Sequence, residues 1–171
     1  MLGVADKKAR LEPYDEEWAR ETERTIERLK EAACPCFVKA EHVGSTAVKG
    51  IWAKPIIDIA LAVSDFSLLD TDRMKRMGFE LRPRTCNSEH LLFAVRDNER
   101  GCDTHYIHTV LPDSRLWREY VGFKDALNGD ENLKNQYMSL KKELCEKYAD
   151  DRTAYTEAKH SFIQRVLENI K

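Results

Sequence analysis

The sequence lacks long hydrophobic runs. No window comes near the ~18 uncharged apolar residues that a membrane-spanning helix requires, and the N-terminal segment has no apolar core followed by a small-residue cleavage site. We therefore expect no membrane partner, no signal peptide and a location in the cytoplasm.

Net charge is almost absent as well. The 28 lysines and arginines are balanced by 30 aspartates and glutamates, which leaves a net charge of −2 at pH 7. A balanced chain has no general attraction to nucleic acid or to anionic lipid, although a local basic patch is compatible with it. The sequence therefore gives no strong sign of nucleic acid as a partner.

Cysteine is scarce, since the chain has five, an odd number, and they form no CxxC pair. Cys34 and Cys36 are separated by a single proline, a spacing that is wrong for zinc sites and for thioredoxin-like redox sites. We interpret the cysteines as thiols in a reducing compartment.

Glycine and proline are also few, at seven and five residues, and they form no linker, repeat or low-complexity tract. A chain of 171 residues with 42% hydrophobic content is long enough to build one core. We therefore predict a single domain over residues 1–171.

Hydrophobic periodicity predicts where this domain is helical. Apolar residues recur at helical spacing before residue 33 and again after Pro112, whereas the middle of the chain has short apolar runs rich in β-branched residues. The predicted helices span 13–33, 46–52, 65–77 and three stretches within 113–171, and the predicted strands span 37–43, 56–63, 79–81, 91–96 and 103–111. The pattern predicts an α+β fold, in which an N-terminal helix and a helical C-terminal part over 113–171 flank a mixed sheet over about 37–111.

A polar turn, Gly44-Ser45-Thr46, follows the first predicted strand. Backbone N–H groups and a hydroxyl at the start of a helix are donors that bind phosphate. We predict phosphate binding by Gly44, Ser45 and Thr46, with Lys54 on the following link as a further candidate. The alternative is that Ser45 or Thr46 only caps a short helix.

A single acid, Asp58, interrupts the second apolar run. Alternation along a strand places Asp58 on the same face as Ala60 and Ala62, whose small side chains leave room beside it. A buried carboxylate must meet a cation, a basic side chain or N–H groups. We predict that Asp58 is catalytic and binds metal; a structural ion pair with Lys54 or Arg96 is the alternative.

Two blocks of this region resemble the signature of the GrpB-like family, which belongs to the nucleotidyltransferase superfamily related to DNA polymerase β. They are Glu41-His-Val-Gly-Ser-Thr-Ala-Val-Lys-Gly50 and Lys54-Pro-Ile-Ile-Asp-Ile59. Further matches to the family pattern follow at Tyr106–Val110, Trp117, Phe123–Leu127, Tyr137, Leu140-Lys141, Tyr155, Lys159 and Phe162-Ile163. The resemblance extends over nearly the whole chain.

The resemblance implies a nucleotidyltransferase fold in which Gly44 and Ser45 hold a triphosphate and Asp58 is the first metal-binding acid. The implied reaction is an in-line attack on the α-phosphate of a nucleoside triphosphate with Mg²⁺ or Mn²⁺ as cofactor, releasing pyrophosphate. The second acid of the active superfamily pattern is replaced by Ala60, so we expect one metal ion or none. Tyr106 replaces the first histidine of a His-x-His pair, which leaves His108 as the matching residue.

The resemblance also implies which residues complete the site. We predict Glu41 and His108 as metal ligands beside Asp58, with His108 also catalytic, and either residue as a general base. Glu41 could equally pair with a lysine, and each histidine could be an ordinary hydrogen-bonded residue. Asp103 and His105 are two other possible replacement ligands, and Lys141 and Lys159 lie on helices that could reach the pocket. Residues with a plainer structural explanation, as core, surface or solvated helix residues, are His42, His105, Tyr137, Lys141, Tyr155 and Lys159.

The leading hypothesis is a protein that binds a nucleoside triphosphate and transfers its nucleotidyl group to an unidentified acceptor, as a metal-dependent enzyme. The first alternative is a catalytically silent module that binds a nucleotide or metabolite. A further alternative is an interaction protein that uses its helical half. The sequence leaves the oligomeric state open.

Overall fold

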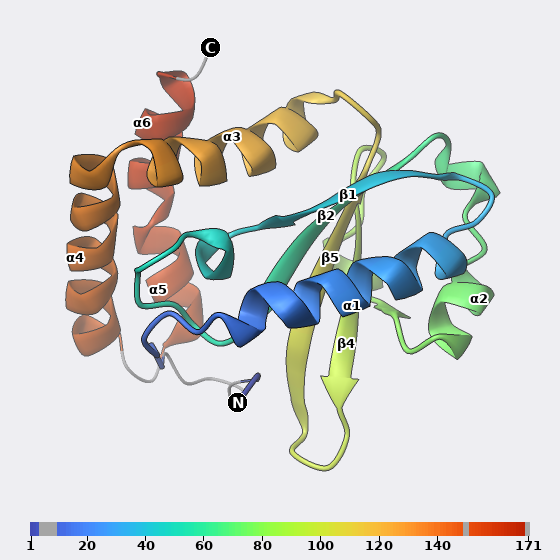
Figure 1. Cartoon of the computed structure of the whole chain (residues 1–171), viewed down its shortest axis with the longest axis horizontal. Coiled ribbons are helices and arrows are strands. Elements are labelled where there is room, and N and C mark those ends of the chain that lie inside the picture. The colour runs from blue at the N-terminus through green and yellow to red at the C-terminus, as the bar shows by residue number, and fades with distance from the viewer. Residues whose placement is uncertain (4–9, 149–150, 170–171) are drawn as a thin grey trace.

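The computed structural model describes residues 1–3, 10–148 and 151–169. Within these residues, five strands form one mixed sheet in the order β1-β2-β5-β4-β3, and only β2 and β5 run parallel (Figure 1). The strands are β1 (Phe37–Val43), β2 (Ile57–Val63), β3 (Glu80–Leu81), β4 (Leu91–Asp97) and β5 (Cys102–Val110). The predicted α+β class and its mixed sheet are confirmed.

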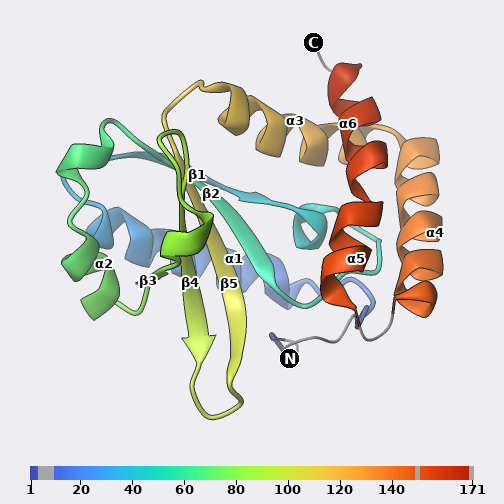
Figure 2. The same ribbon diagram turned by 180° about the vertical axis from the view of Figure 1, so that it is seen from behind.

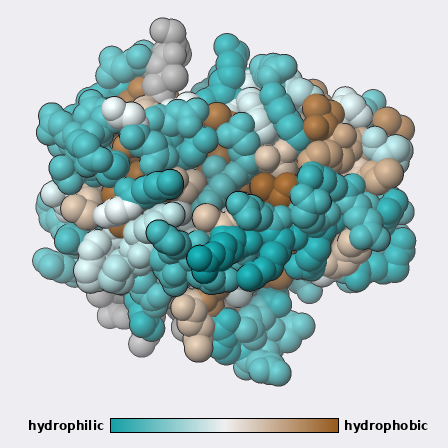
Figure 3. Space-filling model, in the orientation of Figure 1, coloured by the Kyte–Doolittle hydropathy of each residue, from teal (hydrophilic) through white to brown (hydrophobic). Residues whose placement is uncertain are grey.

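Helices α1 (Glu17–Ala32) and α2 (Thr71–Arg76) cover one face of the sheet. Their apolar residues Leu29 and Met74 are fully buried against Ile59 of β2 and Ile107 of β5. The outer side of α1 is charged, and Figure 3 shows hydrophilic side chains spread over this side of the molecule. This face is therefore a packed core.

The opposite face is covered only in part. Helix α3 (Arg115–Gly129) lays Trp117 over Ala60, Ala62 and Val110, which are all buried. The chain then continues into α4 (Glu131–Lys147), α5 (Arg152–Ala158) and α6 (His160–Glu168), which stand beside the sheet (Figure 2). Asp58, which is half-buried, lies on this partly covered face.

The loop between β1 and β2 joins the sheet to the helical part. Its Val48 and Ile51 are buried in a second apolar cluster with Phe123, Tyr137 and Phe162 from three helices. This packing holds the loop against α3, α4 and α6, so that Ser45 and Lys54 face residues more than 80 positions away in the sequence.

Four element predictions are wrong in their bounds. The first helix begins at Glu17 and not near Pro13, because Glu12 pairs through its backbone with Ala53 and the chain is extended there. The helix expected at 46–52 is only a 3₁₀ turn, Ser45–Ala47, since the following residues extend into the second apolar cluster.

The other two errors are interruptions within predicted helices. The stretch 65–77 contains a 3₁₀ turn, Phe66–Leu68, before α2, because Asp65 and Asp70 each accept a backbone N–H and start separate turns. The last predicted helix, marked by Ala158, Phe162, Val166 and Ile170, corresponds mainly to α6; Ala158 ends α5, with only Lys159 between the two helices, and Ile170 lies outside the described residues. None of the helices in the described part of the chain has the length and hydrophobicity that a membrane crossing requires.

Candidate functional site

Gly44 brings the turn directly against Asp58. Val43, the last residue of β1, pairs with Asp58 of β2, and Gly44 then has a positive φ of 69°. A Cβ atom at Gly44 would lie 2.6 Å from Oδ2 of Asp58, which is closer than van der Waals contact allows. The turn therefore requires glycine both for its backbone conformation and for the approach of the carboxylate.

The two hydroxyl residues of the turn have different surroundings. Ser45 lines a cavity, and its Oγ lies 3.4 Å from the hydroxyl of Tyr137. Thr46 is buried, and its Oγ1 lies 2.9 Å from Nε2 of His42 and donates to the carbonyl of Ile56. Burial lowers the pKa of His42 to about 4, so this ring is neutral. Neither hydroxyl caps the 3₁₀ turn, and of the two only Ser45 lines the cavity.

Asp58 is the end of a chain of polar contacts. Its Oδ1 lies 3.2 Å from Nε2 of His108, and Nδ1 of His108 lies 3.2 Å from Nε2 of His90. The ring of Tyr120 packs on His108 at 4.7 Å between centroids, and burial raises the pKa of Tyr120 to about 12. The two contacts are compatible with His90 donating to Nδ1 of His108 while Nε2 of His108 donates to the carboxylate. The three groups form a connected path for a proton.

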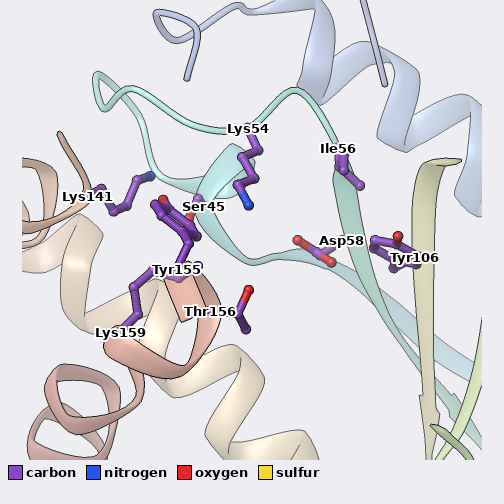
Figure 4. Close-up of a pocket in the computed structure, with 9 residues that line it drawn as sticks. All are labelled: Ser45, Lys54, Ile56, Asp58, Tyr106, Lys141, Tyr155, Thr156 and Lys159. Carbon is purple, nitrogen blue, oxygen red and sulfur yellow. The ribbon is translucent and has the colours of Figure 1, made fainter. Parts of the chain in front are cut away.

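Three lysines converge on a cavity of about 180 Å³ beside Asp58 (Figure 4). Lys54 enters from the β1–β2 loop, Lys141 from α4 and Lys159 from the junction of α5 and α6. The Nζ atoms of Lys54 and Lys159 lie 4.0 and 4.5 Å from the ring centroid of Tyr155, as in cation–π contacts. The cavity thus has three amines and one carboxylate on its walls.

Lys141 is the unusual member of this group. It is 1% exposed, and its Nζ lies 5.0 Å from the ring centroid of Tyr137. This amine has no hydrogen-bond partner among the described residues. Burial lowers the pKa of Lys141 well below its ordinary value, and the charges of Lys159 and Lys54 lower it further. Buried polar atoms are nearly always paired, so a donor that lines a cavity without a partner indicates an acceptor from outside the chain.

Of the two residues predicted to complete a metal site, His108 contacts Asp58, but Glu41 is paired elsewhere. Glu41 accepts from Lys124 at 3.1 Å, and Lys124 also contacts Asp125. Across residues 1–3, 10–148 and 151–169, no group of three or more His, Cys, Asp or Glu side chains is placed to hold a metal ion. Asp58 and His108 alone do not make a two-metal centre, and an amine-rich wall is a poor ligand set for Mg²⁺ or Mn²⁺.

The two other proposed replacement ligands are engaged elsewhere. Asp103 accepts from Arg82 at 2.8 Å and from Arg96 at 3.2 Å. His105 lies on the α1 face of the sheet beside Thr104, and burial lowers its pKa to about 4.

Sequence reasoning missed part of the site. His90 lies between the strands predicted over 79–81 and 91–96, and no periodicity or motif indicated its contact with His108. Thr156, which lines the cavity from α5, had no signal either. Tyr155 was considered as a core residue, and it is buried, but it also forms a wall of the cavity. Lys141 and Lys159 were considered only as helix lysines that could reach the pocket.

Comparisons with known proteins agree on one family. Residues 8–169 match the family described as GrpB protein. The glutamate-rich protein GrpB of Alkalihalophilus pseudofirmus is 33% identical over 174 residues, covering 99% of this chain and all of the relative. The crystal structure of the conserved protein GrpB from Enterococcus faecalis has a TM-score of 0.85 at 24% identity, covering 94% of this chain and 96% of that one, and so shows the same fold.

A more distant similarity involves a protein with a named activity. The dephospho-CoA kinase of Mycolicibacterium paratuberculosis is 25% identical over 193 residues, which cover 94% of this chain. This chain spans only 46% of that kinase, so the name describes a much longer protein.

Proposed function

The chain belongs to the GrpB family, and we propose that it is a nucleotidyltransferase-like protein whose lysine-lined cavity binds the phosphates of a nucleoside triphosphate. The observation that carries this proposal is the buried amine of Lys141 on the cavity wall, which has no hydrogen-bond partner among the described residues. A phosphate oxygen supplies the acceptor that this amine lacks, and charge-assisted hydrogen bonds of this kind are strong.

The charges around the cavity favour a ligand with several negative charges. Lys54, Lys141 and Lys159 line it together, whereas Asp58 is the one acidic residue on its walls among the described residues. The whole chain carries a net charge of −2, so this concentration of amines is local and not a consequence of composition. A linear triphosphate presents several oxygens at once and can reach more than one amine.

Transfer of the nucleotidyl group is the second part of the proposal. It is supported by the path from Asp58 through His108 to His90 at the edge of the cavity. The oxygen of an acceptor attacks the α-phosphorus and forms the new P–O bond, while the bond to the β-phosphate oxygen breaks and pyrophosphate leaves with its electron pair. Asp58 takes the acceptor proton, and the lysines neutralise the leaving pyrophosphate.

Isothermal titration calorimetry tests whether the cavity binds phosphates. Inorganic triphosphate and the four common nucleoside triphosphates are titrated into the wild type, Lys141→Met and Lys142→Met, each with and without Mg²⁺ or Mn²⁺. Lys142 is the matched control, because it is the adjacent lysine, it is exposed, and its ammonium lies over Trp52. Binding by the wild type and by Lys142→Met, with at least a tenfold loss in Lys141→Met, supports the proposal. If none of these ligands binds to the wild type, the proposal is refuted.

Release of pyrophosphate tests the second part. A wild type that binds a nucleotide and releases pyrophosphate with a hydroxyl-bearing acceptor is a transferase. Binding without release, across small-molecule and RNA acceptors, makes the protein the silent nucleotide-binding module instead.

A further inference from the structure

A second cavity, of about 570 Å³, lies next to the lysine-lined cavity and has no part in the proposal above. It is formed by β4, β5 and the segment from β3 into the 3₁₀ turn Pro83–Thr85. Tyr106 lines both cavities, and His108, which lines the second, is in contact with Asp58 of the first. The two cavities therefore meet at Tyr106 and the Asp58–His108 pair.

The volumes of the two cavities indicate which part of a nucleotide each one could hold. Small-molecule sites usually measure roughly 300–1,000 Å³, and at about 180 Å³ the lysine cavity falls below that range. It has room for phosphates but not for a whole nucleotide, so the nucleoside part of a triphosphate must lie outside it. The second cavity falls within the range and adjoins the place where the α-phosphate would lie.

The walls of the second cavity suit a flat, largely apolar group. Leu81, Pro83 and Leu92 supply aliphatic surface and Tyr106 supplies an aromatic ring. The neighbour of Tyr106 on β4 is Ala94, whose small side chain adds little bulk beside the ring. Nucleobases stack well on aromatic side chains, because every base presents a π-face.

The aromatic wall is held in place before any ligand binds. The hydroxyl of Tyr106 donates to Oδ2 of Asp103 at 3.2 Å, and Oδ1 of Asp103 accepts from Arg82 at 2.8 Å and from Arg96 at 3.2 Å. Arg82 itself donates to Glu80. These bonds join β3, β4 and β5 behind the ring, so that little ordering is needed when a base binds.

We propose that the second cavity binds the nucleoside part of the triphosphate, with the base against Tyr106 and the phosphates extending past Asp58 to the three lysines. This inference rests on the proposed function, since it places the remainder of the same ligand. It also places the α-phosphate at the boundary of the two cavities, next to the carboxylate that takes the acceptor proton. The ligand class is a nucleotide with an uninterrupted triphosphate.

The test compares two probes, inorganic triphosphate and the tightest of the four common nucleoside triphosphates, by calorimetry. Stacking of a base predicts that the nucleotide binds the wild type about 5- to 150-fold more tightly than inorganic triphosphate. Leu92→Trp fills the second cavity from β4, and it should remove this gain while leaving the affinity for inorganic triphosphate unchanged. Leu68→Trp, at an exposed residue outside both cavities, is the matched control and should change neither affinity.

A second variant keeps the proposal falsifiable if Leu92→Trp does not fold. Thr85 is exposed and lines the cavity from the 3₁₀ turn, so Thr85→Trp adds the same bulk at a more tolerant position. Loss of the nucleotide's advantage in either folded variant supports the proposal. Equal affinities for both probes in the wild type overturn it and leave phosphate binding intact.

Two other outcomes are also distinguishable. If the filled variants keep nucleotide affinity but lose pyrophosphate release, the cavity holds the acceptor and the nucleoside assignment is wrong. If inorganic triphosphate does not bind the wild type at all, the proposed function itself fails.

Discussion

Replacing Lys141 by methionine should stabilise the empty protein and remove phosphate binding together. Methionine is apolar and flexible and has nearly the length of the lysine stem, so it keeps most of the buried contacts. It removes an amine that is 1% exposed and has no hydrogen-bond partner among the described residues. A buried, unsatisfied polar group costs about 1–3 kcal/mol, and the free energy of unfolding should rise by that amount in Lys141→Met.

The gain should depend on pH in a defined direction. The pKa of Lys141 is lowered in the folded protein by burial and by Lys159 and Lys54, so between that pKa and the unfolded value of 10.5 the unfolded chain binds more protons. The free energy of unfolding of the wild type therefore rises with pH in this window, by at most about 1.4 kcal/mol per pH unit. The advantage of Lys141→Met should be largest at low pH and should shrink as pH rises towards 10.5.

Urea unfolding between pH 6 and 9.5, for the wild type, Lys141→Met and the control Lys142→Met, measures this effect. In thermal scans a gain of 1–3 kcal/mol corresponds to about 2–12 °C for a chain of this size. Lys142→Met should stay within about 0.5 kcal/mol of the wild type because Lys142 is exposed. If Lys141→Met is less stable than the wild type across the pH range, Lys141 is a structural residue and the reasoning is refuted.

Three further predictions concern the same site. Above the pKa of Lys141 in the empty protein, affinity for inorganic triphosphate should fall by up to about tenfold per pH unit, because the amine must take up a proton to bind. Titrations in buffers of different ionisation enthalpy measure the uptake of that proton. An affinity of the wild type that does not change with pH would contradict this prediction. Gly44→Ala should lower the free energy of unfolding by about 1–3 kcal/mol, because the added Cβ would lie 2.6 Å from Asp58 and the backbone has a φ of 69°. The loss should appear as a lower midpoint of urea unfolding, and an unchanged midpoint would show that the turn adapts. Asp58→Asn should keep triphosphate binding within about threefold but lose pyrophosphate release, and equal release by the variant would remove Asp58 from the chemistry.

The sequence predicted the parts of the site that depend on local periodicity. Alternation placed Asp58 with Ala60 and Ala62, and the strand register confirms that Asp58 and Ala60 share a face with Tyr106 and His108. The glycine of the turn was identified, although its reason, the approach of the carboxylate, depends on pairing between β1 and β2.

The parts that depend on packing between distant segments were left open. Lys54, Lys141 and Lys159 lie on three elements, and only the packing of the β1–β2 loop on the helices brings their amines to one cavity. From the sequence alone, a lysine at such a helix position is predicted to be solvated, because the position of the neighbouring helix is not known. His90 was missed for the same reason, because its partner is set by the register of β4 on β5.

The stability of the chain and its affinity for an anion are linked through the same three amines. Burying Lys141 near Lys54 and Lys159, with no ion pair to it among the described residues, raises the free energy of the empty folded state. A carboxylate in reach of Lys141 would remove that strain, but it would also compete with a phosphate for the amine. The site instead leaves the amine without a hydrogen-bond partner among the described residues and has Asp58 with His108 at the cavity edge. A polyanion that pairs with the three amines at once lowers the free energy of the folded state, which the buried amine raises in the empty protein. This decrease contributes to the affinity for the polyanion.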